Sequence, residues 1–315
     1  MDKDVAVFGQ LARDLVLVVD RVPEAGESAR VLARREMLGG KGANQAVALA
    51  QLGMRPALIA VAGDDGTGTR LLRQAARDGV NVSAVTRRPG ARTGLVVDVV
   101  DPSGQWRYLE DLPPAVLLTK TDVAAAASLL TRARWVSLQL QQPPEAALAA
   151  AGLAAGAGAT IVLDGAPPGG EHLDELLRLA DVVRADAREA SLLAGAEITS
   201  EASARRAAKR IMRLGPDLVA LAVGDAGNYF AWSGGDLLLP LTDTPVADTT
   251  GAGDAFTAAL IAGLARGDGP EGAARLAVAA AGATVGRPGG RPDLSGQALD
   301  RQLALLDMRA PAAGV

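Results

Sequence analysis

The sequence contains no cysteine and a single histidine, His172. Disulfides, thiolate nucleophiles and metal sites built from cysteines or several histidines are therefore excluded. Aromatic residues make up only 3% of the chain, which argues against a stacking face for single-stranded nucleic acid. The formal net charge of −4 gives no overall attraction to nucleic acid or anionic membranes. An anionic ligand must then be held by local features, such as helix N-termini, arginines or metal ions.

Long apolar segments are also missing. No run approaches the length of a membrane span, and residues 1–4 lead directly into a short apolar run without the pattern of a signal peptide. We therefore expect a cytoplasmic protein. The 315 residues, 49% of them apolar, suffice for one large α/β domain with a substantial core.

Short apolar runs alternate with longer helical patterns along the chain. Strands are expected at Val5–Phe8, Ala57–Val61, Trp135–Leu138, Thr160–Leu163, Val182–Val183 and Leu218–Val223. Helices are expected at Gly66–Asp78, Pro144–Gly156, Leu173–Leu179, Ala187–Ala194 and Ser203–Leu214. This alternation predicts a three-layer α/β fold, in which helices flank both faces of a mostly parallel sheet. Ligands of such sheets bind beyond the carboxyl ends of the strands.

Four segments interrupt the alternation. Asp14–Asp20 and Val31–Met37 follow the first strand without a helix between them, and Gly94–Val100 and Trp106–Glu110 flank a turn at residues 101–104. We expect these segments to form a small β-sheet within the single domain 1–315, covering about residues 11–38 and 92–112. An exposed apolar face on such a sheet indicates a lid over an active site or a dimer interface.

The segment Asp248-Thr249-Thr250-Gly251-Ala252-Gly253-Asp254 precedes a helical run. Its glycines allow consecutive N–H groups to point at an anion from a helix N-terminus, as a transferring phosphoryl group requires. Asp254 would lie in the first turn, where a carboxylate can accept the proton of an incoming hydroxyl. The alternative is an acid that merely complements the helix dipole after a glycine turn.

Two further segments each allow a functional and a structural interpretation. Gly39–Asn44 is no P-loop, because no Ser or Thr follows the lysine at the required spacing. It is either a tight turn into a helix or a backbone that approaches a polyhydroxylated ligand closely. Asp186 and Glu189 stand three residues apart at a strand-to-helix junction. They form either a capping box or a pair of acids that organises Mg²⁺ waters.

Together these segments resemble the ribokinase (PfkB-type) family of sugar and nucleoside kinases over nearly the whole chain. The Gly39–Asn44 run is similar to the family's N-terminal signature, and Asp248–Asp254 is similar to its C-terminal signature. The resemblance implies an ATP-dependent kinase with the ribokinase-like fold, Mg²⁺ as a cofactor and K⁺ as a candidate second ion. It also implies a homodimer through the lid, without nucleic-acid or membrane partners.

The resemblance assigns roles residue by residue. It implies Asp254 as the catalytic base and Gly251, Ala252 and Gly253 as the anion hole. Substrate-binding positions would be Asp14, Gly40, Gly42, Asn44 and Gln141. Nucleotide-binding positions would be Asp186, Ala222, Gly224, Asp225, Gly227 and Val278. Glu189 would serve Mg²⁺, and a monovalent cation would lie at Asp248, Thr250, Thr284, Arg287, Gly289 and Asp293.

The sequence departs from ribokinases proper in the substrate pocket. Ala12 stands where they have Asn, and Gln141 stands where they have Glu. An unmet substrate hydroxyl costs ~1–3 kcal/mol, so we expect a hydroxyl pattern other than that of D-ribose. Three functions stay open: a kinase of a sugar or sugar derivative, a nucleoside kinase of the same fold, and a non-catalytic sugar-binding relative.

Overall fold

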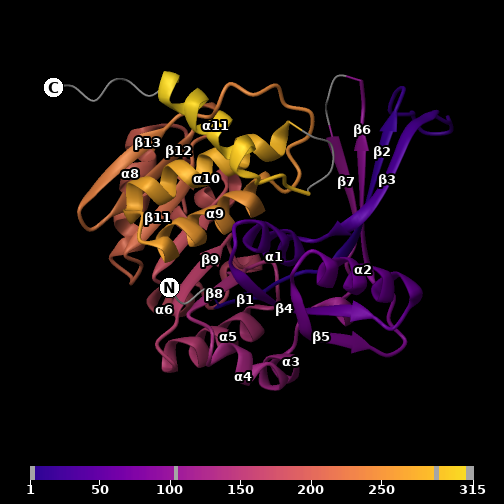
Figure 1. The fold of residues 1–315 in the computed structure, drawn as a ribbon, viewed down its shortest axis with the longest axis horizontal. Coiled ribbons are helices and arrows are strands. Elements are labelled where there is room, and N and C mark those ends of the chain that lie inside the picture. The colour runs from indigo at the N-terminus through magenta and orange to yellow at the C-terminus, as the bar shows by residue number, and fades with distance from the viewer. Residues whose placement is uncertain (1–3, 103–105, 287–290, 310–315) are drawn as a thin grey trace.

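Two sheets organise the chain, a large one of nine strands and a small one of four (Figure 1). The computed structural model describes residues 4–102, 106–286 and 291–309. The strand order of the large sheet is β13-β12-β11-β10-β9-β8-β1-β4-β5. Its strands are β1 Asp4–Phe8, β4 Arg55–Gly63, β5 Asn81–Arg88, β8 Trp135–Gln139, β9 Thr160–Asp164, β10 Val182–Ala185, β11 Leu218–Ala222, β12 Asn228–Trp232 and β13 Gly235–Leu239.

The neighbouring strands from β5 to β11 pair in parallel, and β12 and β13 are antiparallel at one edge. All six strand segments predicted from the sequence lie in this sheet, so the mostly parallel α/β fold is confirmed. β5 and the antiparallel pair were not predicted. The strand order reverses direction at β1, which lies between β8 and β4. Such a switch point opens a crevice at the carboxyl ends of the strands.

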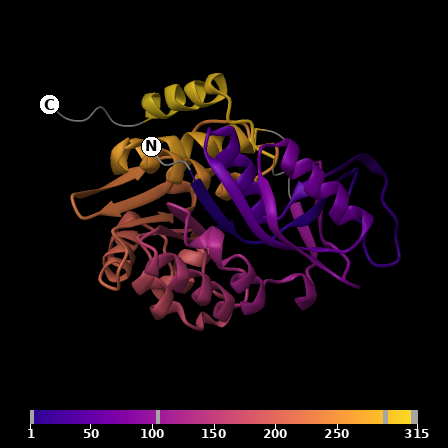
Figure 2. The same ribbon diagram turned by 60° about the horizontal axis from the view of Figure 1, so that its bottom comes forward.

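Helices cover both faces of the large sheet (Figure 2). Val5 and Val7 of β1 pack with α1, α9, α10 and α11 on one face, whereas Ala6 and Phe8 pack with α3 to α8 on the other. This alternation follows from the two-residue period of a strand. The helices are α1 Lys41–Gln51, α2 Gly66–Arg77, α3 Lys120–Ala125, α4 Ala127–Leu130, α5 Pro144–Gly156, α6 Leu173–Leu179, α7 Ala187–Ala194, α8 Glu201–Met212, α9 Ala252–Arg266, α10 Gly269–Val285 and α11 Gly296–Arg309. Within the described ranges, none of them is long and apolar enough to cross a membrane.

The small sheet projects from the body of the molecule (Figure 1). It consists of β2 Ala12–Val19, β3 Val31–Gly39, β6 Gly94–Val100 and β7 Trp106–Asp111, in the order β3-β2-β6-β7. Only the β2–β6 pair is parallel. The predicted small sheet is therefore present, and its role as a lid stays a prediction. Asp14 lies opposite Val96 and Val16 lies opposite Asp98, which places both aspartates on one face of this sheet.

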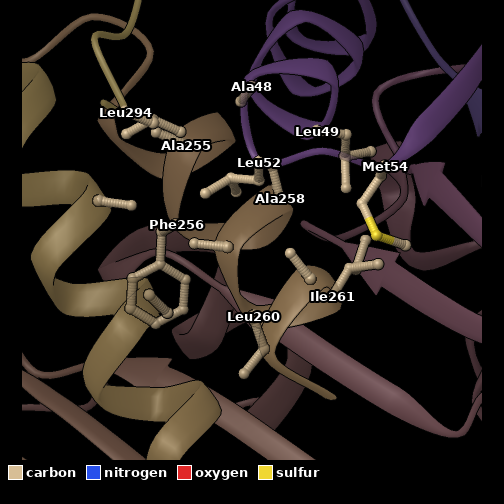
Figure 3. Close-up of a cluster of buried hydrophobic side chains, with 14 of the residues drawn as sticks. Ala48, Leu49, Leu52, Met54, Ala255, Phe256, Ala258, Leu260, Ile261 and Leu294 are labelled. Atoms are coloured by element: carbon tan, nitrogen blue, oxygen red, sulfur yellow. The ribbon is translucent and has the colours of Figure 1, made fainter. Parts of the chain in front are cut away.

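Helix α9 is held against α1 by a cluster of apolar side chains (Figure 3). Ala48 and Leu49 of α1 face Ala255 and Ala258 of α9, and alanines at this contact allow the two helices to approach closely. α9 also packs on α10 so tightly that a Cβ added to Gly263 would lie 2.7 Å from a backbone atom of the next helix. These contacts thus fix α9 against α1.

Candidate active site

The glycine run before α1 allows two backbones to cross. A Cβ added to Gly42 would lie 2.7 Å from the carbonyl carbon of Gly9, the residue after β1, and Gly40 has a positive φ of 86°. The Ala43 N–H donates to the Gln10 carbonyl at 3.0 Å. Larger residues at these glycines would separate α1 from the end of β1. The crossing brings the start of α1 to the carboxyl end of the large sheet.

Asp254 lies buried in the first turn of α9, three residues after the N-cap Gly251, whose φ is 73°. Its carboxylate accepts a hydrogen bond from Asn44 Nδ2 at 3.0 Å and another from Gln45 Nε2 at 3.3 Å. Burial, with the nearby Asp164 carboxylate, raises the pKa of Asp254 to about 7. A carboxyl group with this pKa can accept a proton near neutral pH, as a general base must.

A second layer of polar side chains holds the partners of Asp254. Gln45 Nε2 also donates to Asp164 Oδ2 at 2.7 Å, and Gln45 Oε1 accepts from Ser137 Oγ at 2.8 Å. Thr257 Oγ1 donates to Asp164 Oδ1 at 3.0 Å. The sequence analysis did not single out Gln45 or Asp164. Asp164 is the last residue of β9 and so lies at the carboxyl ends of the strands, where ligands of such sheets bind. Nothing in the sequence around Asp164 indicated that Gln45 is its partner.

Arg184 joins this network from β10. Its NH1 lies 3.0 Å from Asp164 Oδ1 and 3.9 Å from Glu189 Oε2. Glu189 Oε1 is 3.2 Å from Lys41 Nζ. Burial opposes ionisation of Glu189, but Lys41 and Arg184 together hold its pKa below the usual range. Arg184 and Lys41 were not predicted as site residues.

Asp186 and Glu189 form the capping box of α7. Asp186 Oδ1 accepts from the Glu189 N–H at 2.8 Å, and Glu189 Oε2 accepts from the Asp186 N–H at 3.0 Å. Within the described residues, no group of three or more carboxylates or histidines is close enough to hold a metal ion. Two carboxylates can hold waters of a Mg²⁺ whose other ligands are nucleotide phosphates.

The small sheet contributes two buried acids. Asp14 packs on Gly39 and accepts from the Gly40 N–H. Burial and the charges of Asp254, Asp98 and Asp248 raise the pKa of Asp14 to about 7. Burial and Asp248 raise the pKa of Asp98 to about 6. One oxygen of Asp98 is buried and has no hydrogen-bond partner among the described residues, which leaves an acceptor for a substrate hydroxyl.

Tyr108 connects the small sheet to the loop before α9. Its hydroxyl lies 2.7 Å from Thr250 Oγ1, and Thr250 Oγ1 is 3.4 Å from Asp98 Oδ2. The Thr250 N–H donates to Asp248 Oδ1 at 2.8 Å. Asp98 and Tyr108 were missed because neither belongs to a recognisable motif. Their alternation within strands of the small sheet was the only signal that could have placed them on one face.

A cavity of about 260 Å³ lies beside the first turn of α9. Ala252 and Gly253 form part of its wall, and Phe256, Val278 and Asn228 line it further. Ala222 ends β11, and the turn of Gly224, Asp225 and Gly227 leads into β12, where Asn228 begins. The structure thus brings Gly253 and Val278 to one cavity and places the predicted nucleotide turn next to it.

The predicted cation-site residues are brought together in part. The N–H groups of Ala247 and Asp248 donate to the Val285 carbonyl at 2.8 and 3.2 Å. The loop of Asp248 and Thr250 therefore lies against the end of α10, which carries the buried Thr284. Asp293 Oδ1 accepts from the Ser295 N–H at 3.3 Å. Arg287 and Gly289 lie outside the described residues.

Gln141 is exposed and lines a different cavity of about 660 Å³ together with Asp186 and Glu189. Its carbonyl accepts from Gln10 Nε2 at 3.2 Å. Within the described part of the chain, its side chain makes no hydrogen bond with Asp14, Asn44 or Asp254. Ala12 is buried at the start of β2 and offers no polar group.

Comparison with known proteins gives consistent matches. Residues 2–295 match the family model described as "pfkB family carbohydrate kinase". The chain is 31% identical over 265 residues to a ribokinase of Staphylococcus aureus, covering 84% of this chain and 87% of that protein. It is 33% identical over 263 residues to a bifunctional ribokinase/ribose-5-phosphate isomerase A of Fructilactobacillus sanfranciscensis, covering 83% of this chain but only 48% of that protein. The structure of an Arabidopsis thaliana ribokinase complexed with ribose and ATP superposes with a TM-score of 0.79 at 26% identity, covering 96% of this chain and 99% of that one.

Proposed function

The chain belongs to the pfkB family of carbohydrate kinases and is an ATP-dependent sugar kinase, and from this premise we propose that Asp254 is its catalytic base. The observation that carries the proposal is the environment of the Asp254 carboxylate. It is buried at a helix N-terminus, held by Asn44 and Gln45, and has a pKa of about 7. A carboxylate so placed can accept the proton of a hydroxyl as the hydroxyl attacks phosphorus.

The reaction requires little covalent chemistry from the protein. The acceptor hydroxyl oxygen bonds to the γ-phosphorus, and the bond from that phosphorus to the β–γ bridging oxygen breaks. The electron pair of this bond stays on ADP, and the hydroxyl proton passes to Asp254. N–H groups at the start of α9, including that of Gly253, would then face the oxygens on which negative charge is concentrated.

The nucleotide would lie in the cavity beside α9. Apolar Val246 and Val278 suit the flat faces of an adenine ring, and Asn228 can donate and accept hydrogen bonds. Gly253 at the cavity wall would place the γ-phosphate next to Asp254. Mg²⁺, when bound, neutralises phosphate charge, and the acids Asp186 and Glu189 would hold its waters.

We propose K⁺ as a second ion, beside Asp248, Thr250 and Thr284. The loop meets the end of α10 there, where the N–H groups of Ala247 and Asp248 donate to the Val285 carbonyl, and the Asp248 carboxylate would attract a cation. Such an ion would add positive charge next to the anion hole. The requirement is testable, because activity would rise when Na⁺ is replaced by K⁺ at constant ionic strength.

The acceptor pocket favours an uncharged sugar or sugar derivative. Asp14 and Asp98 are acceptors for hydroxyl protons, and they would repel an acceptor that already carries a phosphate. Ala12 removes one hydrogen-bonding group relative to ribokinases. We therefore propose a polyhydroxylated acceptor whose hydroxyl pattern differs from that of D-ribose.

We propose further that the small sheet closes as a lid, since the Tyr108–Thr250 contact already joins it to the loop before α9. Its other face carries apolar residues, including Leu109, which is 64% exposed. A dimer through this face would cover them. A cytoplasmic location is proposed because the cell supplies ATP there.

The direct test is ADP release with Mg²⁺ across a panel of pentoses, hexoses, keto-deoxy acids and nucleosides, with and without K⁺. We expect turnover on one class of sugar and an Asp254→Asn variant that binds this sugar but turns over at least about 100-fold more slowly. Asp174→Asn, an exposed position on α6, is the matched control. An Asp254→Asn enzyme as fast as wild type would refute the assignment of the base. Turnover on nucleosides alone would show that the acceptor is a nucleoside and not a sugar.

A further inference from the structure

Arg184 is placed unlike the other arginines of the described chain. It is the next-to-last residue of β10, and its guanidinium lies over the ring of Phe256 with its Cζ 5.6 Å from the ring centre. Its NH1 donates to Asp164 Oδ1 at 3.0 Å. Only 13% of the side chain is exposed. A cation fixed by an aromatic ring and a carboxylate in this way has already lost the rotamer freedom that binding an anion would otherwise remove.

The guanidinium also lies close to Gly253 in the first turn of α9. A Cβ added to Gly253 would be 2.7 Å from Arg184 NH2 and 2.9 Å from NH1. Glycine at this position therefore leaves room for the arginine as well as freeing the backbone. The close approach to Gly253 places the guanidinium, a group with five N–H donors, beside the N–H groups of the first turn of α9.

Arg184 is the sole charged side chain that lines the 260 Å³ cavity among the described residues. Most of the other lining side chains are apolar or small, such as Val246, Phe256 and Val278. In a wall of this kind, one fixed cation would bind the phosphate end of a nucleotide strongly, because little water screens it. NH2 of Arg184 donates no hydrogen bond to any described residue, so this donor is available.

We propose that Arg184 contacts the γ-phosphoryl oxygens of ATP and stabilises the negative charge on them during transfer. This inference rests on the proposed kinase function and adds a residue to it. Asp164 and the Phe256 ring orient the guanidinium, which leaves NH2 for the phosphoryl group. The arginine acts only by charge and hydrogen bonding, so no further bond forms or breaks.

The alternative role for Arg184 is structural, because it neutralises the buried Asp164. The two roles predict different turnover rates for a double variant. Arg184→Gln alone leaves Asp164 without its cation, whereas Arg184→Gln combined with Asp164→Asn removes both charges. If neutralising Asp164 were the only role, the double variant would turn over at the rate of Asp164→Asn.

The experiment compares kcat, the KM for sugar and nucleotide affinity in wild type and in these variants. Arg184→Gln should lower kcat about 10²–10³-fold, the loss seen when one donor to a developing oxyanion is removed, and leave the KM for sugar within about threefold. The double variant should stay as slow as Arg184→Gln. Arg184→Lys should be intermediate, because it keeps the charge but loses the planar fork.

Arg205→Gln is the matched control. Arg205 also lies over an aromatic ring, with its Cζ 5.9 Å from the centre of Tyr229, and it pairs with Glu201 and Asp236. It is on α8, and 43% of its side chain is exposed. We expect its kcat to stay within about twofold of wild type.

A binding measurement separates this inference from the kinase assignment. Wild type should bind ATP more tightly than ADP, and Arg184→Gln should lose most of that preference. A wild type that phosphorylates no sugar would remove the proposed function, yet this ratio would still test Arg184. An Arg184→Gln enzyme within threefold of wild-type kcat, or with an unchanged ATP-to-ADP preference, would overturn the proposal.

Discussion

The pH dependence of turnover tests the role of Asp254 most directly. Its pKa of about 7 means that the base is mostly ionised at pH 8 and mostly protonated at pH 6. Because only the carboxylate can accept a proton, kcat should fall about tenfold for each pH unit below 7. At pH 5 kcat would be about 1% of its value at pH 8. Asp14, whose pKa is also about 7, would steepen the fall of kcat/KM.

A substitution that changes the pKa of Asp254 should shift the acidic limb of the pH profile, the fall of kcat below pH 7, in a known direction. Asn44 donates to Asp254 Oδ2 at 3.0 Å, and this hydrogen bond lowers the pKa of Asp254. A hydrogen bond contributes about 1 kcal/mol, and one pKa unit corresponds to about 1.4 kcal/mol. Asn44→Ala should therefore shift the limb of kcat to higher pH by about 0.5–1 unit. Asn81→Ala, at an exposed asparagine far from the site, should not shift it.

The assay should quantify phosphorylated sugar directly at saturating sugar and MgATP, because coupling enzymes have pH optima of their own. Circular dichroism at each pH would show that the fold persists. A kcat that stays constant from pH 8 to pH 5 would refute Asp254 as the base. A limb that moves to lower pH in Asn44→Ala would refute the account of its pKa.

Three more substitutions have outcomes that follow from the structure. Gly253→Ala should lower kcat about 100-fold in a stopped assay, because its Cβ would displace Arg184 from the anion hole. Gly152→Ala, where a Cβ on α5 meets open space, should raise the free energy of unfolding by about 0.5–1 kcal/mol in denaturant titrations. For Asp98, the folded pKa of about 6 exceeds the ordinary pKa of 3.8, so wild type loses stability as pH rises between the two. Asp98→Asn should therefore melt about 2 °C higher than wild type at pH 8, after allowance for solvent screening, and at the same temperature near pH 4; a lower Tm at pH 8 would contradict this.

The sequence predicted the fold well where a segment carries its own signal. Val5–Phe8 is apolar throughout and Thr160–Leu163 is apolar apart from Thr160, as strands buried on both faces must be, and only β8 separates the two in the sheet. β5 was missed because its burial is only partial and its sequence mixes charged and apolar residues. β12 and β13 were missed because the parallel pattern gives no reason to expect an antiparallel edge.

The site was predicted where glycines and acids are close together in sequence. Asp254 and Asn44 were predicted in this way. The structure brings their side chains within 3.0 Å of each other across 210 positions, and their catalytic and binding roles stay predictions. Gln45, Asp164 and Arg184 were not found, because each acts through a partner that is distant in the chain. Only the fold determines that the ends of β9 and β10 meet the first turns of α1 and α9.

The residues proposed to face the acceptor and those proposed to handle phosphate come from different parts of the fold. Asp14, Asp98 and Tyr108 belong to the small sheet, whereas Asp254 and Arg184 belong to the large domain. A gene encoding this fold can therefore accumulate changes in β2, β6 and β7 that alter the preferred acceptor, while the machinery of phosphoryl transfer is inherited intact. Proteins that descend from such a gene would then change the acceptor that they phosphorylate before they change the reaction that they catalyse.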